Sequence, residues 1–415
     1  MNIEFDSSLA NDDDDVILRP NTTSTLSTFS CFIIFINGFL GVGFFYNSRH
    51  FRCGLIFTTI VNFIVAFLAY YGSWMLIYAM KIRKTTYFET IWKASGYKAT
   101  FLISLFIAAP CLGYTANDMS HMNYAFKTFI QSVFVDAPTW LTDPYLFNFF
   151  LIFIVYLPSS WRHDLKALQI FSFIKLFIVT TLIILCIYWC CIGIKEDGFD
   201  PNNQVTMFNF SEDFVLCASE LIGTYVSYPF IFVVLNAMHN LTYNRAKSTI
   251  KSSFITFSLL LEVVGIFQYF TLYNIEIETP FLYLLDNSQL SVKIGLATYI
   301  LYYVCTLPVF IEPMRLSSIF IVSITEDLPQ FTWSSMEIIW LLTASLFSTL
   351  TNSYISLLTT LLTIASLIMQ FITPPLMLYK VMYTLPKYHW IAIILFIILG
   401  CIFSIYLLVS IYYIF

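Results

Sequence analysis

The stretch FINGFLGVGFF, residues 35–45, lies inside an apolar run that is long enough to be a membrane helix. It nevertheless contains Asn37, Gly38, Gly41 and Gly43 within two turns. Gly costs roughly 1 kcal/mol relative to Ala inside a helix, and an amide in hydrocarbon needs a hydrogen-bond partner. We therefore predict a locally unwound helix whose freed backbone groups bind a ligand and an ion. Close helix packing is the alternative, although these glycines lack GxxxG spacing.

Composition places the whole chain in a membrane. Of its 415 residues, 59% are hydrophobic and 11% are charged, and the mean hydropathy is +0.78. A soluble domain has about 25% charged residues. No nucleophile and base occur at readable spacing and the histidines are scattered, so we predict that the chain is not an enzyme. We expect the lipid bilayer as its surroundings, and no nucleic acid partner, metal or cofactor.

Eleven segments have the length and composition of membrane spans. The acidic segment 1–25 precedes them and is predicted to be a disordered tail, whereas 26–415 forms the membrane domain. Only the short polar stretch 351–354 marks the boundary between the ninth and tenth spans, so one long kinked span there would give ten. The predicted spans lie near residues 26–47, 54–80, 99–117, 144–158, 168–192, 213–236, 248–271, 290–311, 336–355, 356–378 and 389–414.

The basic residues predict the orientation of the spans. With a cytoplasmic N-terminus, the cytoplasmic segments hold 14 of the chain's 20 Lys and Arg residues. Cytoplasmic loops of membrane proteins are enriched in these residues. We therefore predict a multi-pass protein whose N-terminus is cytoplasmic and whose C-terminus is outside.

A second irregular span occurs five spans later. Residues 220–240 read ELIGTYVSYPFIFVVLNAMHN, with Gly223, Thr224, Ser227 and Pro229 in the middle. Pro lacks a backbone donor and clashes with the preceding turn, so we predict a break near residues 226–228. Interrupted first and sixth spans are what a five-plus-five inverted repeat produces, with one helix added at the C-terminus.

Several motifs resemble those of the amino acid/auxin permease family, within the amino acid–polyamine–organocation superfamily. The resemblance extends over almost the whole membrane region, and its motifs are NGFLGVG (37–43), YFETIWKASG (87–96), PSSWRHDLKALQIFS (158–172), TLP (306–308) with Pro313 and Arg315, and ITPPLMLYK (372–380). The chain departs from the family where sodium-coupled members read Cys-His-Pro, because it has Ser227, Tyr228 and Pro229 there.

The resemblance implies a secondary active transporter that moves amino acids by alternating access as a symporter. Backbone N–H groups of the first break would face the substrate carboxylate, and carbonyls of the second break would take its ammonium. Neither the amino acid, the direction nor the oligomeric state can be read from the sequence, and both plasma and vacuolar or lysosomal membranes fit. The predicted substrate-binding residues are Gly41, Val42, Gly43, Thr224, Tyr225, Ser227, Tyr228 and Tyr114.

Two coupling ions remain open. Asn37 matches the first-span Asn of sodium-coupled relatives and Thr306 falls where their eighth-span hydroxyl lies, so both would give oxygen ligands to Na+. Proton coupling is the alternative, because Lys175 and Glu262 are ionisable groups at membrane depth. Lys175 could instead extend to the cytoplasmic interface. Glu262 has no obvious partner in the sequence.

Three other charged residues are predicted to be structural. Asp118 follows the third span and is expected to be exposed at its outer end, whereas Glu312 and Arg315 are expected to form a helix-surface ion pair. A sensor that binds an amino acid on the same fold without net transport is the second functional hypothesis. We prefer transport because long soluble extensions, which sensors often carry, are not seen.

Overall fold

The computed structural model describes residues 17–19, 26–41, 44, 50–85, 87–134, 136–160, 166–197, 205–209, 221–226, 228–272, 281–322, 330–350, 363–382 and 387–414. The longer helices are α3 (Leu55–Arg83), α4 (Tyr87–Val133), α7 (Lys166–Asp197), α10 (Tyr243–Leu272), α11 (Leu290–Val322), α12 (Gln330–Ser348) and α15 (Lys387–Ile414). The shorter elements are β1 (Ile17–Arg19), α1 (Thr28–Phe39), η3 (Phe51–Cys53), η4 (Thr139–Thr142), α5 (Pro144–Phe150), the π-helix η5 (Leu151–Tyr156), α6 (Leu157–Ser160), α9 (Tyr228–Ala237), β2 (Leu241–Thr242), η6 (Phe281–Leu284), the π-helix η7 (Ile368–Ile372) and α14 (Thr373–Val381).

The described helices account for all eleven predicted spans. Six are long and apolar enough to cross a membrane, and five shorter apolar helices lie at the positions of the other predicted spans. The ninth and tenth spans are separate, because α12 ends at Ser348 and the next described helix begins at Thr363. Large apolar side chains face outward, such as Phe67 and Phe177, which are 63% and 75% exposed. In a bilayer this surface would contact lipid.

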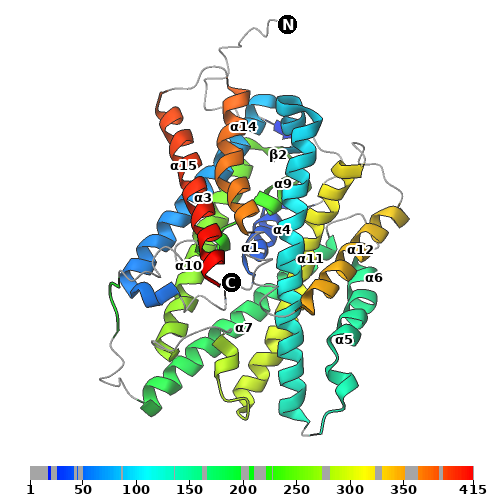
Figure 1. The fold of residues 1–415 in the computed structure, drawn as a ribbon, viewed down its shortest axis with the longest axis vertical. Helices are drawn as coiled ribbons and strands as arrows, with labels where there is room; N and C mark the ends of the chain where they lie inside the picture. Colours follow the sequence, from blue (N-terminus) through cyan, green and yellow to red (C-terminus); the bar gives the residue numbers. More distant parts are fainter. Residues whose placement is uncertain are drawn as a thin grey trace, which may run out of the picture.

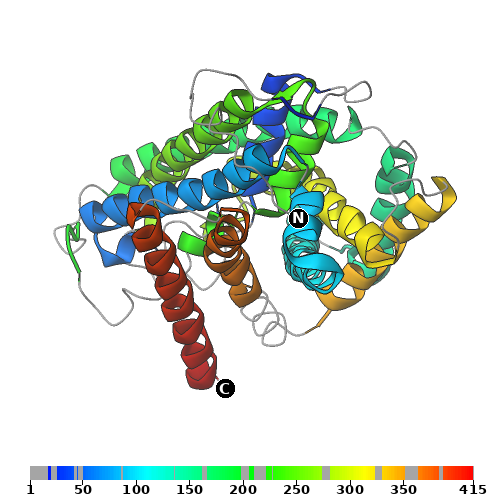
Figure 2. The ribbon, with the colours of Figure 1, turned by 90° about the horizontal axis from the view of Figure 1, so that it is seen from above.

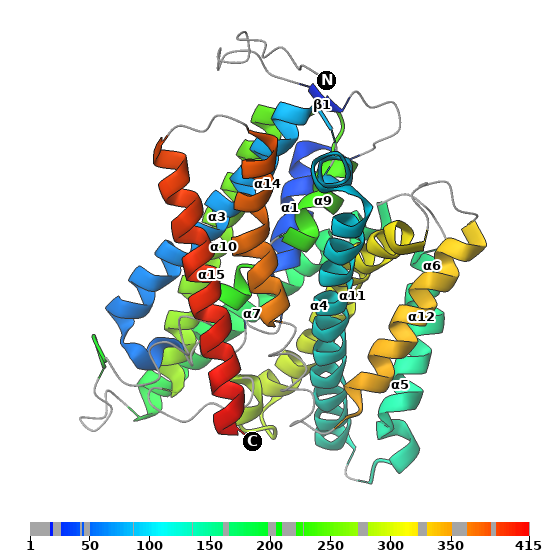
Figure 3. The same ribbon diagram turned by 45° about the horizontal axis from the view of Figure 1, so that its top comes forward.

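Helices α1 and α9 form the centre of the structure (Figure 3). The two helices pack against each other, and α1 also contacts α7, α10 and α11. Ser27 caps the start of α1 by accepting a hydrogen bond from the Ser30 backbone N–H at 3.1 Å. From Ile33 to Phe39 every residue of α1 is buried. A helix that is apolar all round is expected in the interior, so the sequence of α1 explains its position.

Both predicted interruptions are present. Helix α1 ends at Phe39, and Leu40 has a non-helical ψ of 78°. Residues 42 and 43 of the first motif lie outside the described residues. In the sixth span, residues 221–224 are helical, Tyr225 and Val226 are not, and α9 begins at Tyr228. The predicted break beside Pro229 is confirmed, because Pro cannot donate the helical hydrogen bond to the Tyr225 carbonyl.

Helix α4 is much longer than the span predicted over 99–117 (Figure 1). It changes direction at Gly96, whose φ of 76° favours glycine, and then continues to Val133. It packs against α11 and α12. The polar residues after 117 predict an end of the span there, but Met119 and Met122 between them are fully buried. The predicted outer end of the third span was therefore wrong.

The N-terminal segment and the end of the sixth span are paired. Strands β1 and β2 are antiparallel, with Ile17 opposite Thr242 and Arg19 opposite Leu241. A second contact follows at Leu26, whose N–H donates to the Ala237 carbonyl at 3.3 Å and whose carbonyl accepts from the His239 N–H at 3.0 Å. The rest of the predicted tail lies outside the described residues. The C-terminal helix α15 extends away from this centre when viewed from above (Figure 2).

Gly38 contributes close packing between α1 and α9. A Cβ atom added to Gly38 would lie 2.6 Å from Cγ of Phe230. We expect Gly38→Ala to lower the free energy of unfolding by about 1 to 3 kcal/mol, because overpacking a dense core forces side chains to shift. Thermal denaturation in detergent would measure this effect.

The matched control for this prediction removes the obstructing ring. Gly38→Ala combined with Phe230→Leu should be less destabilised than Gly38→Ala alone, because a smaller side chain leaves room for the added methyl group. Equal melting temperatures for wild type and Gly38→Ala would contradict the predicted clash.

Candidate functional site

Lys175 holds the interrupted end of α1. It belongs to α7, its side chain is 0% exposed, and its Nζ donates to the carbonyls of Asn37, at 3.3 Å, and Leu40. These carbonyls lie where a helix end leaves its C=O groups without intrahelical partners and carries partial negative charge. The ammonium therefore satisfies them. Extension to the cytoplasmic interface, the alternative considered for Lys175, does not occur.

Tyr302 of α11 completes the surroundings of this ammonium. Its ring centroid lies 4.3 Å from Lys175 Nζ, within the range of a cation–π interaction. Its hydroxyl donates to the Gly41 carbonyl at 3.0 Å. The Gly41 N–H donates to the Phe39 carbonyl at 2.9 Å. Backbone groups of the first break are thus held by side chains from α7 and α11. Tyr302 was not among the site residues predicted from the sequence.

The two predicted sodium ligands lie on neighbouring helices. Asn37 is 2% exposed, and its Nδ2 donates to Ser172 Oγ on α7 at 2.9 Å. Its Oδ1 has no hydrogen-bond partner among the described residues. The Thr306 hydroxyl donates to the Tyr302 carbonyl of its own helix at 2.8 Å. An unpartnered amide oxygen can bind a cation, and whether Asn37 and Thr306 share an ion stays a prediction.

Two of the predicted substrate residues, Tyr114 and Gly41, approach the same side chain, that of Phe310. Tyr114 of α4 donates to Ser366 Oγ at 3.1 Å, and its ring centroid lies 5.8 Å from that of Phe310 on α11. Phe310 also approaches Gly41, since Cζ lies 3.7 Å from a Cβ built there. The Thr224 hydroxyl donates to the Leu221 carbonyl at 2.7 Å. Val42, Gly43, Ser227 and the Tyr228 side chain lie outside the described residues.

Glu262 has partners that its sequence did not reveal. The carboxylate on α10 accepts hydrogen bonds from two side chains of α3, the Thr59 hydroxyl and the Asn62 amide, the latter at 2.9 Å. Asn62 in turn accepts a hydrogen bond from the Tyr225 hydroxyl at the second break. Within the described residues no hydrogen bond joins Glu262 to Lys175. The two predicted proton-coupling candidates therefore belong to different networks.

Asp118 is buried, contrary to the expectation of exposure. Only 2% of the residue is exposed, because α4 continues past the predicted end of its span. Its carboxylate interacts electrostatically with Lys175 of α7 and with the Tyr302 hydroxyl of α11. A buried carboxylate thus lies near the ammonium that holds α1. Recognising that Met119 and Met122 continue a buried helix face could have indicated this position.

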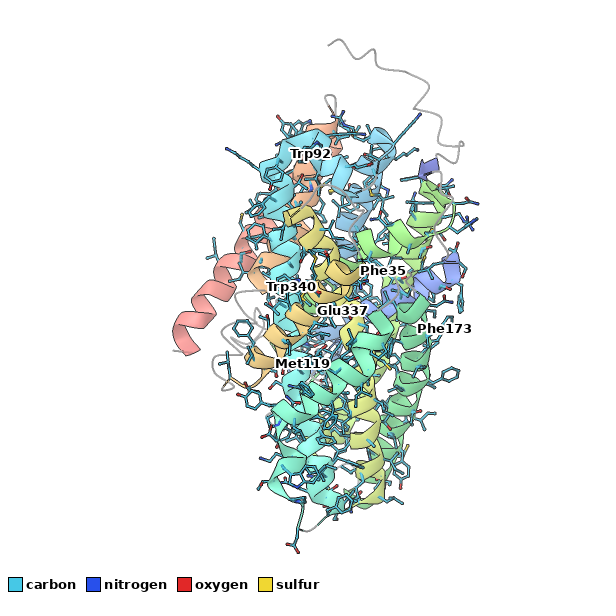
Figure 4. All side chains as sticks on the ribbon, turned by 90° about the vertical axis from the view of Figure 1, so that its right-hand side faces the viewer. Phe35, Trp92, Met119, Phe173, Glu337 and Trp340 are labelled. Atoms are coloured by element: carbon cyan, nitrogen blue, oxygen red, sulfur yellow. The ribbon has the colours of Figure 1, made fainter. Side chains whose placement is uncertain are left out.

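The Glu312–Arg315 pair is also buried, not on a helix surface as expected. Arg315 donates to Glu312 on α11 and, at 3.0 Å, to Glu337 on α12, and the Arg315 side chain is 5% exposed. Figure 4 labels Glu337 and Trp340 on α12, and Trp340 donates to Ser318 of α11 at 2.8 Å. These contacts join α11 to α12.

Comparison with known proteins identifies the chain's relatives. A family model described as "Transmembrane amino acid transporter protein" matches residues 24–414. No curated protein matches the sequence significantly.

Solved structures share the fold at low sequence identity. A structure of MhsT in complex with L-phenylalanine has a TM-score of 0.58 at 11% identity and covers 94% of this chain and 100% of that one. The Eremococcus coleocola manganese transporter with an aromatic bis-isothiourea compound has a TM-score of 0.57 at 10% identity, covering 96% and 91%. The nucleobase-cation-symport-1 transporter Mhp1, in a closed conformation with bromovinylhydantoin bound, has a TM-score of 0.55 at 11% identity. The match covers 84% of this chain and 78% of that one. The predicted all-α membrane fold, a five-plus-five inverted repeat with interrupted first and sixth spans, is confirmed.

Proposed function

Because the chain belongs to the family of transmembrane amino acid transporter proteins, we propose that it moves an amino acid across a membrane by alternating access, coupled to a proton gradient. Interrupted helices expose backbone groups at membrane depth, where they can bind the carboxylate and ammonium of such a substrate. In this proposal Gly41 and Tyr225 belong to the two breaks that hold the substrate.

The contact of Lys175 with the end of α1 supports proton coupling. The carbonyls of Asn37 and Leu40 form a place where a cation is favoured, and a fixed ammonium occupies it. A desolvated lysine can lose its proton, unlike arginine. Loss of that proton would remove the charge that holds these carbonyls, and so would couple proton binding to the conformation of the first break.

Sodium coupling is the second candidate, favoured by the Oδ1 atom of Asn37. This buried oxygen has no hydrogen-bond partner among the described residues and is of the type that a hard cation prefers. Asn37→Ala should abolish a sodium dependence of uptake if this oxygen binds the ion.

Uptake into proteoliposomes tests the proposal. The purified protein would be offered a panel of labelled amino acids under a pH gradient and, separately, under a sodium gradient. We expect accumulation that requires the pH gradient and collapses with a protonophore. Binding of an amino acid without uptake under either gradient would contradict transport and favour a sensor.

A further inference from the structure

We infer that Asn62 is a positioning residue that passes the state of the Glu262 carboxylate to Tyr225, and thereby sets the geometry of the second break for substrate binding. This inference rests on the proposed function, because the break is assigned to the substrate there. It adds a residue on α3 and a direction of hydrogen bonding that the binding site itself does not contain.

The hydrogen bonds around Asn62 form a directed chain. The ionised Glu262 carboxylate can only accept, so the Asn62 amide must turn its nitrogen toward it and its oxygen toward Tyr225. The same nitrogen also donates to the Ser258 carbonyl at 3.3 Å. Asn62 is 1% exposed and Tyr225 is 0% exposed, so water does not substitute for any of these partners.

Tyr225 connects the hydrogen bonds around Asn62 to the second break. Its carbonyl has no helical donor, because the residue four positions later is Pro229. Anchoring the Tyr225 side chain to Asn62 therefore fixes the position of a carbonyl that lacks this helical donor. The Tyr225 ring also lies 6.4 Å from that of Phe39, the last residue of α1, and 5.2 Å from that of Phe257. Displacement of Tyr225 would consequently alter the packing at both breaks.

A change in the charge of Glu262 would reverse the direction of the hydrogen bonds from Glu262 through Asn62 to Tyr225. Without a full carboxylate charge, the Asn62 nitrogen is held only by the longer hydrogen bond to the Ser258 carbonyl, at 3.3 Å. Rotation of the amide would break that bond and present the nitrogen to Tyr225, whose hydroxyl would then accept instead of donating. The groups that contact Glu262 from α3 are the neutral Thr59 and Asn62, and the titratable group that interacts with it from the sixth span is Tyr225. The Glu262 carboxylate and the Ser258 carbonyl thus together select the orientation of the Asn62 amide.

A double-mutant cycle tests the relay. KM and maximal rate of amino acid uptake would be measured for Asn62→Leu, for Tyr225→Phe and for the two combined, per amount of folded protein. We expect Tyr225→Phe to raise KM about five- to tenfold, the effect of losing one buried hydrogen bond. Asn62→Leu should raise KM at least as much, because it also removes the hydrogen bonds to Glu262 and Ser258. The combined variant should have the same KM as Asn62→Leu alone, because the hydrogen bond between Tyr225 and Asn62 is already broken in that variant. Strictly additive effects would overturn the relay.

An exchange of the two side chains supplies a second, independent measurement. Glu262→Gln alone should raise KM as Asn62→Leu does. Glu262→Gln combined with Asn62→Asp puts the acceptor-only group at position 62, where it can accept hydrogen bonds from the amide at 262 and from the Tyr225 hydroxyl. The hydrogen bond to the Ser258 carbonyl is lost in this variant, so KM should fall clearly below that of Glu262→Gln without fully reaching the wild-type value. Failure of this rescue in a folded variant, with KM as high as in Glu262→Gln, would contradict the inference.

A matched control separates positioning from general packing. The Ser253 hydroxyl is fully buried on α10, but its hydrogen bond, 2.8 Å long, stays within that helix at Thr249. Ser253→Ala should leave KM unchanged. Melting temperatures in detergent should be similar for Tyr225→Phe and Ser253→Ala, and an equal rise of KM in both variants would overturn the specific role. Absence of uptake by the wild-type protein would contradict the proposed function instead.

Discussion

Lys175→Ala should reduce proton-driven uptake of amino acids by at least about a hundredfold. The substitution removes an ammonium that donates to two backbone carbonyls at the end of α1 and lies over the Tyr302 ring. Hydrogen bonds to a charged group contribute roughly 1.5 to 3 kcal/mol each, and their buried acceptors would be left without a donor. Initial uptake rates in proteoliposomes under an imposed pH gradient would measure the loss.

Lys175→Arg is the informative control, because arginine keeps the charge and hydrogen-bond donors but is not deprotonated in proteins. We expect this variant to fold and to lose the dependence of uptake on the pH gradient. Gel filtration in detergent would show that both variants remain folded. If Lys175→Ala still accumulated substrate under a pH gradient, the proton-coupling role would be wrong. Sodium-driven uptake that survives Lys175→Ala would favour the site at Asn37.

Arg315→Ala should destabilise the protein by about 3 to 5 kcal/mol, the usual cost of removing one member of a buried ion pair. Arg315 joins Glu312 and Glu337 in the buried α11–α12 contact, and without it two carboxylates would face each other at low dielectric. Thermal denaturation in detergent, followed by tryptophan fluorescence, should show a large fall in melting temperature.

Glu337→Gln provides the comparison for Arg315, because it keeps a hydrogen-bond acceptor in place while removing one negative charge. We expect a smaller loss of stability than for Arg315→Ala, since Arg315 retains Glu312. An Arg315→Ala protein that melts like the wild type would show that the contact contributes nothing net to folding. Because the contact joins α11 to α12, we expect the KM of the surviving folded protein to be unchanged.

The span pattern and both interruptions could be predicted because each depends on local sequence. Runs of about 20 apolar residues mark the spans, and Pro229 removes a backbone donor whatever surrounds it. The glycines of the first motif have two different structural roles. Gly38 allows close packing against Phe230, whereas Gly41 lies in the break. Both interpretations of the first-span glycines therefore apply, at different positions.

Tertiary contacts could not be predicted in the same way. The burial of Asp118 depends on the continuation of α4 against α11, and the partners of Glu262 come from a helix 200 to 203 positions away in the sequence. The sequence did indicate that Asn62 has a hydrogen-bond partner, since an amide within an apolar span needs one. It did not identify that partner. Whether Lys175 reaches the interface or the interior was likewise decided only by packing.

The pairing of β1 with β2 has a mechanical consequence. Leu26, just before α1, both donates and accepts a backbone hydrogen bond with the residues at the end of α9, next to the pairing of β1 with β2. Separating these ends would break several backbone hydrogen bonds together. A conformational change that opens this end of the protein is therefore expected to carry the two half-helices as one body, and the N-terminal segment would travel with them.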